Sequence, residues 1–91
     1  MANIDIVQQG PDTFQVTVSV GRSQTVHDVT VDESAREKYG SGVDPKRLVE
    51  ESFHFLLERE PKEMILAKFE LPAIEGYFPE YPVEIARRLS A

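Results

Sequence analysis

The strictest hydrophobic pattern in the chain is an alternation of apolar and polar residues at 14–20, FQVTVSV. A period of two places successive side chains on opposite faces of a strand, so the segment predicts a half-buried β-strand. The buried face is expected to carry Phe14, Val16, Val18 and Val20, and the solvated face Gln15, Thr17 and Ser19.

Two further strands are expected beside this one. Residues 3–8, NIDIVQ, place two isoleucines on one side, and residues 24–31, QTVHDVTV, are rich in β-branched side chains. The sequences GPD and GRS between these segments are typical of turns, and short turns join antiparallel neighbours. Residues 1–31 are therefore predicted to form a three-stranded antiparallel β-meander.

A helical pattern follows the strands. In DESAREKYG, residues 32–40, Ser34 and Glu37 fit a capping box and Gly40 fits a helix end, so one or two helical turns are expected. A stronger helix is predicted from Pro45 to about Glu60, with Asp44 as its N-cap.

The apolar side chains of this main helix cover an arc of about 200°. They are Leu48, Val49, Phe53, Phe55, Leu56 and Leu57, together with the small Ser52; the narrow polar stripe contains Arg47, Glu50, Glu51, His54 and Glu58. So wide an arc predicts contacts on two sides, with the sheet on one and the C-terminal helices or a second subunit on the other.

Prolines divide the rest of the chain, because proline ends or restarts a helix. Short helices are expected near 62–69, 73–78 and 82–89. Strands come first and helices second, which indicates an α+β fold. The predicted fold is a single domain, 1–91, with the meander at 1–31 followed by a helical part at 32–91, a main helix and two or three short C-terminal helices.

Composition is that of a soluble globular chain, with 41 % hydrophobic and 29 % charged residues. No apolar run reaches the roughly 20 residues that a membrane span needs. The first residues, MANIDIVQQG, lack the features of a signal peptide, so a cytoplasmic location is expected. Cysteine is absent, which excludes disulfides, thiolate metal sites and a cysteine nucleophile.

The net charge of −6 bears on the choice of partner. Acids outnumber bases both before and after Pro45, so neither half of the chain is basic. Affinity for nucleic acid comes largely from Lys and Arg that neutralise phosphates, which makes nucleic acid an unfavourable partner. An acidic chain is better suited to basic protein partners.

Residues 65–82, ILAKFELPAIEGYFPEYP, resemble a DNA-reading helix-turn-helix in outline only. That motif wants a small residue, a turn glycine and a buried aliphatic residue, where this chain has Leu66, Glu70 and Gly76. Its second helix would present glutamates and no base-reading side chain to the groove.

The preferred interpretation is an aromatic-rich cap on the core, formed by Phe69, Leu71, Ile74, Tyr77, Phe78 and Tyr81. Phe69, Ile74 and Phe78 should be buried, with Glu70, Glu75 and Glu80 in solvent. The two tyrosines should bury their rings and keep their hydroxyls near the surface.

His54 has three carboxylates beside it on a helix, from Glu50, Glu51 and Glu58. The arrangement could hold a weak divalent-metal site or an acid–base pair. A solvated helix face is preferred, because one helix surface supplies no walls for a site. His27 is expected on a distant strand.

No spacing links a serine to a histidine base, and the glycines form no phosphate-binding loop. No catalytic, cofactor-binding or metal-binding residue is therefore assigned. An enzyme acting on a small ligand would need a pocket that only the fold could assemble.

The segment EESFHFLLEREPKEMILAKFELPAIEGYFPEYPVEI, residues 50–85, resembles a group of small uncharacterised bacterial proteins. They share an ESF.FLLEREPKE.IL helix followed by an F.L..I..YFPEY tail. The resemblance covers about 40 % of the chain and implies no activity, cofactor or catalytic residue. The order of strands and helices is also loosely similar to small antitoxin-type proteins, an analogy of fold alone.

The leading hypothesis is an interaction module without catalysis, which binds a protein partner or forms a homodimer. It rests on a surplus of apolar and aromatic surface for so small a chain and on the lack of a catalytic constellation. The alternative is an antitoxin-like regulator that contacts nucleic acid through Arg87, Arg88 and residues 65–82.

Overall fold

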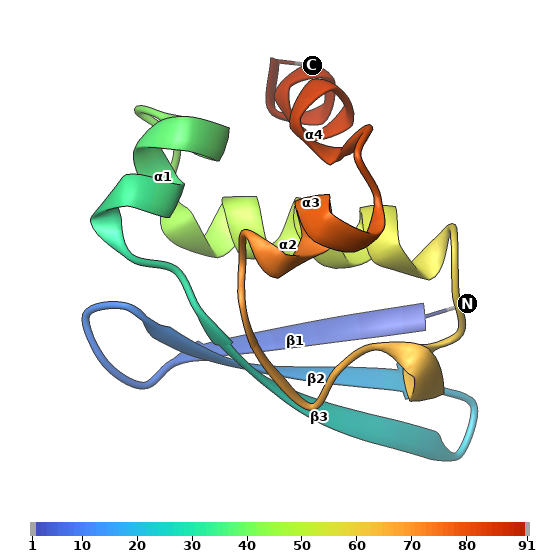
Figure 1. Cartoon of the computed structure of the whole chain (residues 1–91). Helices are drawn as coiled ribbons and strands as arrows, with labels where there is room; N and C mark the ends of the chain where they lie inside the picture. Colours follow the sequence, from blue (N-terminus) through green and yellow to red (C-terminus); the bar gives the residue numbers. More distant parts are fainter. Residues whose placement is uncertain (1, 91) are drawn as a thin grey trace.

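A four-stranded mixed sheet carries helices on one face in the computed structural model, which describes residues 2–90 (Figure 1). Its strands, in spatial order, are β1 (Ala2–Gln8), β2 (Thr13–Val20), β3 (Ser23–Thr30) and β4 (Lys68–Glu70). The helices are α1 (Glu33–Gly40), α2 (Pro45–Leu57), the 3-10 helix η1 (Lys62–Met64), α3 (Ala73–Tyr77) and α4 (Tyr81–Ser90).

The predicted antiparallel meander is confirmed for β1, β2 and β3. Pairing is regular along both ladders, and Gly21 closes the β2–β3 turn with a φ of 60°, which glycine adopts at low cost. Phe14, Val16 and Val18 are buried as expected. Val20 is 41 % exposed, contrary to prediction, because it is the last residue of its strand before the turn.

The helix predicted near 62–69 is wrong. Helical structure stops after the single turn of η1, and Lys68–Glu70 forms β4 instead, parallel to β3. Phe69 lies opposite Val29 on the buried face of the sheet, while its two charged neighbours face solvent. Residues 32–91 are therefore not wholly helical, and a piece of this half of the chain completes the sheet.

The two helices predicted directly after the strands, α1 and α2, are both present. The N-cap of α1 differs from the predicted one. The carboxylate of Asp32 accepts a hydrogen bond from the Ala35 amide at 2.9 Å, so α1 does not begin with the Ser34 capping box. At α2, Asp44 accepts from the Lys46 amide at 3.0 Å, and Pro45 occupies the first turn as predicted. This helix ends at Leu57, three residues earlier than expected.

The two-sided burial of α2 is confirmed. On the sheet side, the ring of Phe53 lies 5.4 Å from that of His27 and 6.1 Å from that of Phe69, measured between centroids. On the other side, Phe55 packs against Tyr81 of α4 at 5.3 Å. Figure 1 shows α2 between the sheet and the outer helices.

The C-terminal aromatics are only partly as predicted. Phe69 and Ile74 are buried and Phe78 is half-buried, whereas Tyr77 is 68 % exposed. Tyr77 is the last residue of the five-residue helix α3. This helix is so short that Ile74 is its one buried side chain. Glu70 and Glu80 face solvent as expected.

Glu75 is instead half-buried, because Tyr39 donates a hydrogen bond of 2.6 Å to its carboxylate. This hydrogen bond, together with one from Lys38, lowers the pKa of the Glu75 carboxyl. The contact fastens α3 to α1.

Tyr81 buries its hydroxyl as well as its ring, which corrects the expectation of a hydroxyl near the surface. The Ser52 hydroxyl donates to the Leu48 carbonyl at 2.7 Å, so its oxygen accepts from Tyr81, also at 2.7 Å. Burial raises the pKa of the Tyr81 hydroxyl. A polar partner inside the core thus replaces the contact with water.

Tyr81→Phe is expected to lower the free energy of unfolding by about 1 kcal/mol, because it removes one buried hydrogen bond and keeps the ring. Tyr77→Phe is the matched control, since its hydroxyl belongs to an exposed side chain. Urea denaturation at neutral pH would measure both. Equal stability of the two variants would contradict the Ser52–Tyr81 contact.

Candidate functional site

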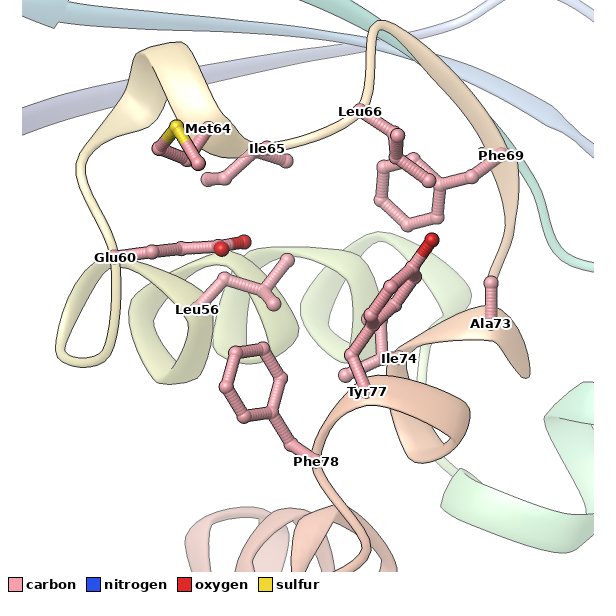
Figure 2. A pocket seen from close by; sticks show the side chains of 10 residues that line it. All are labelled: Leu56, Glu60, Met64, Ile65, Leu66, Phe69, Ala73, Ile74, Tyr77 and Phe78. Atoms are coloured by element: carbon pink, nitrogen blue, oxygen red, sulfur yellow. The ribbon is translucent and has the colours of Figure 1, made fainter.

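An apolar groove opens between the end of α2, the η1–β4 segment and α3 (Figure 2). It encloses a volume of about 280 Å³. Leu56, Phe69 and Ile74, which are buried in the core, form its floor. The groove therefore reaches down to the hydrophobic core at one side of the molecule.

Three large side chains at this opening remain in contact with solvent. Met64 is 66 % exposed, Leu66 is 46 % exposed and Tyr77 is 68 % exposed. Single exposed apolar residues are common on protein surfaces, but several around one concave opening are typical of an interaction site. This grouping is the main reason to regard the groove as functional.

Two buried side chains hold the η1–β4 segment in place. His27 Nδ1 lies 2.8 Å from the Leu66 carbonyl oxygen, which can only accept, so Nδ1 carries the proton. Lys62 donates a hydrogen bond of 2.6 Å to Ser23, the first residue of β3, and also pairs with Glu63. The wall of the groove is thereby fastened to the sheet at both ends.

The same geometry gives His27 a structural role. Its Nε2 accepts a hydrogen bond from Thr25 at 2.8 Å when Nδ1 donates to Leu66, and its ring packs on Phe53. The side chain is 2 % exposed. His27 thus lies on the inner face of the sheet, as its alternation with Val29 and Val31 suggests.

Glu60 is the one acidic residue lining the groove. Figure 2 shows its carboxylate extending between Leu56 and Ile65. Burial raises the pKa of this carboxyl, and no ion pair reaches it from any residue in 2–90. The folded state therefore favours the protonated carboxyl of Glu60. Its contribution to the free energy of unfolding is fully present below the pKa of the unfolded chain and is lost as the pH rises through the folded pKa.

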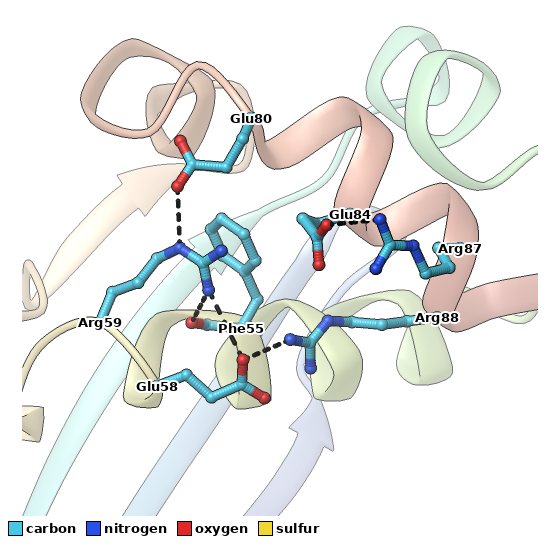
Figure 3. A network of polar contacts seen from close by, with 7 residues as sticks. All are labelled: Phe55, Glu58, Arg59, Glu80, Glu84, Arg87 and Arg88. Atoms are coloured by element: carbon cyan, nitrogen blue, oxygen red, sulfur yellow. Dashed lines mark hydrogen bonds and ion pairs between the residues drawn. The ribbon is translucent and has the colours of Figure 1, made fainter.

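A second polar cluster joins α2 to α4 (Figure 3). The Arg59 guanidinium stacks 3.7 Å from the centroid of the Phe55 ring and donates to Glu80 at 3.0 Å. Arg88 donates to Glu58, and this hydrogen bond lowers the pKa of the Glu58 carboxyl. The cluster covers the outer face of the core with paired charges.

The structure also shows the surroundings of the charged residues considered from the sequence, which are Arg87 with Arg88 and His54 with its glutamates. Arg87 pairs with Glu84 at 3.1 Å, so it and Arg88 both face carboxylates. His54 is exposed on α2, and Glu58 beside it is engaged by Arg88. Within residues 2–90, no three His, Cys, Asp or Glu side chains come close enough together to hold a metal ion.

The sequence does not predict the groove. Its lining comes from four segments, and only their packing brings Glu60 beside Leu66 and Tyr77. The available signal was indirect: Pro61 and Pro72 separate a segment rich in apolar residues from the helices on either side.

Comparison with protein-family models, curated proteins and solved structures finds no significant match to this chain. The resemblance of residues 50–85 to small bacterial proteins stays a prediction. None of the helices described in residues 2–90 has the length and apolarity to cross a membrane.

His27→Leu is expected to lower the free energy of unfolding by about 1–3 kcal/mol, because it removes the hydrogen bonds that the buried His27 ring makes with the Leu66 carbonyl and with Thr25. The amide signals of residues 65–67 should move in an NMR spectrum. His54→Leu is the matched control at an exposed histidine and should change neither quantity appreciably. Similar losses in the two variants would contradict the role given to His27.

Proposed function

We propose that this protein is a non-catalytic interaction module that binds an apolar segment of a partner protein in the groove. The observation that carries the proposal is the exposure of Met64, Leu66 and Tyr77 around one opening. A partner that covers these side chains would remove apolar surface from water, which is the main driving force for protein association.

The charge of the groove indicates the chemistry of that segment. Glu60 lies in an apolar site without an ion pair from residues 2–90, and the whole chain carries a net charge of −6. A carboxylate attracts a cation more strongly in such surroundings than in bulk water. The partner segment is therefore expected to place Lys or Arg beside its apolar residues.

The size of the groove supports a protein partner over a small-molecule substrate. Its volume of about 280 Å³ lies just below the usual range for small-molecule sites, about 300–1,000 Å³. The opening is bordered by exposed apolar side chains that an enclosed small molecule would leave uncovered. One or two side chains of a partner fit the space, and its backbone would cover the border.

The nucleic-acid alternative has less support. Residues 65–82 contain β4 and a helix of five residues, and so lack the two helices of a helix-turn-helix. Arg87 and Arg88 have carboxylate partners. A gel-shift titration with duplex DNA at low salt should show no complex, whereas a complex that weakens steeply with added salt would favour this alternative.

Peptides selected by phage display against the parent chain should combine aromatic or aliphatic residues with Lys or Arg. Their affinity, measured by fluorescence polarisation, should fall at least about tenfold for Leu66→Glu, because a charge at the rim opposes burial of apolar groups. Val83→Glu introduces the same charge at an exposed apolar residue of α4 that does not line the groove, and should leave affinity unchanged. Equal binding to both variants would place the site elsewhere.

The role of Glu60 can be tested with the same peptides. Glu60→Gln should weaken a selected peptide that contains Lys by about tenfold, because the charge pair is lost. A version of that peptide with norleucine in place of Lys should bind the parent and Glu60→Gln chains alike. Loss of both peptides would mean that Glu60 shapes the groove and does not recognise a cation.

A further inference from the structure

The sheet has one long open edge, which belongs to β1. Seven residues of this strand pair with β2 in an unbroken register from Ala2 opposite Val20 to Gln8 opposite Phe14. No strand among the described residues pairs with the other side of β1. Backbone N–H and C=O groups on that side are therefore available to another strand. At the opposite edge, the three-residue strand β4 pairs with Asp28–Thr30 of β3, and side-chain hydrogen bonds from Lys62 to Ser23 and from His27 to the Leu66 carbonyl hold the η1 segment beside the rest of β3.

The sequence of β1 contains few of the usual features that prevent pairing at an edge. Natural edge strands are commonly protected by lysine, proline or a bulge. The seven residues ANIDIVQ include neither lysine nor proline, their ladder with β2 has no bulge, and their single charge is Asp5. Such an edge is open to β-strand addition.

The inner face of β1 is also incompletely covered. Ile6 is buried, whereas Ala2 and Ile4 on the same face are half-buried and pack at the margin of the core. A strand added beside β1 would extend the sheet and cover the exposed parts of these two side chains. The uncovered surface is thus continuous with the hydrophobic core.

We propose that β1 pairs with β1 of a second copy of this chain, antiparallel, about a two-fold axis at Ile4. An axis perpendicular to the sheet keeps both helical layers on the same side and makes one continuous sheet. Ile4 then lies opposite Ile4 of the other copy, and Ala2 opposite Ile6. On the outer face, Asp5 lies opposite Asn3.

Side-chain chemistry favours this register over the registers with an axis at Asp5 or at Ile6. An axis at Asp5 would place the two Asp5 carboxylates directly opposite each other, which is destabilising. An axis at Ile6 would place Ile4 opposite Gln8 and Asp5 opposite Val7. The axis at Ile4 matches apolar with apolar on the inner face and gives each carboxylate an amide neighbour.

The edge and the groove lie at opposite sides of the sheet. Phe69, which lines the groove, belongs to β4, whereas β1 is the first strand in the spatial order. Pairing through β1 therefore leaves the groove open, and each copy in the dimer keeps its own groove. This inference does not depend on what the groove binds.

Because the chain lacks cysteine, disulfide trapping can test the register directly. Ile4→Cys, Asp5→Cys and Ile6→Cys would each be exposed to a mild oxidant and resolved on a non-reducing gel. The Ile4→Cys variant should form the covalent dimer fastest, at least tenfold faster than the other two. Faster cross-linking through either of the others would overturn this register.

Sedimentation equilibrium tests the association itself without relying on a cysteine variant. The parent chain should be dimeric at high micromolar concentration. Ile4→Lys should raise the dimer dissociation constant at least tenfold, with its fold checked by circular dichroism. Val26→Lys adds the same charge at an exposed position of β3, which β2 separates from β1, and should leave the constant unchanged.

Two results would overturn the proposal. One is a parent chain that stays monomeric at millimolar concentration. The other is a dimer that survives Ile4→Lys and is disrupted by Leu66→Glu, because that dimer would use the groove. If Ile4→Lys fails to fold, the cross-linking rates of the three cysteine variants still decide between the registers.

Discussion

The structure depends on the burial of α2, which is apolar over more of its surface than a sheet alone can cover. Phe53 turns toward the sheet and Phe55 turns toward α4, and each buried phenylalanine contributes roughly 1.5–3 kcal/mol. The chain must therefore supply a layer on either side of α2. The meander forms one layer, and α1, α3 and α4 form the other. The hydroxyl groups of Ser52 and Tyr81 form a hydrogen bond with each other where the outer helices meet α2.

The groove follows from the path between the two layers. After α2, the chain descends to the sheet edge as η1 and β4, and then returns to the helical layer as α3 (Figure 1). His27 and Lys62 hold the lower part of this path, and the Tyr39–Glu75 contact holds α3. Between these contacts the exposed apolar side chains of the groove lie on a backbone that is held at both ends, and nothing among residues 2–90 covers them. A pre-formed site of this kind loses little conformational freedom on binding.

Local patterns predicted the elements whose stability is local or strictly periodic. The alternation at 14–20 identified β2, and Asp44 with Pro45 identified the start of α2. The pairing of β4 could not be predicted in this way, because Asp28 and its partner Lys68 are 40 residues apart and three residues carry too little periodicity. The buried hydroxyl of Tyr81 depends equally on a distant partner, Ser52. The groove depends on the pairing of β4 with β3 and on the hydrogen bond between His27 and the Leu66 carbonyl, so periodicity alone could not reveal it.

Charge acts in opposite directions on the two proposed associations, which are the pairing of two copies through β1 and the binding of a partner segment in the groove. The chain carries a net charge of −6, and Arg36, Arg59 and Arg88 already pair with carboxylates of the same chain. Two like-charged copies repel each other at long range, whereas a segment with Lys or Arg is attracted. Salt screens both effects, with a Debye length of about 8 Å at physiological ionic strength. Added salt should therefore strengthen pairing through β1 and weaken binding in the groove. Opposite responses to salt would show that the two surfaces work by different physical interactions.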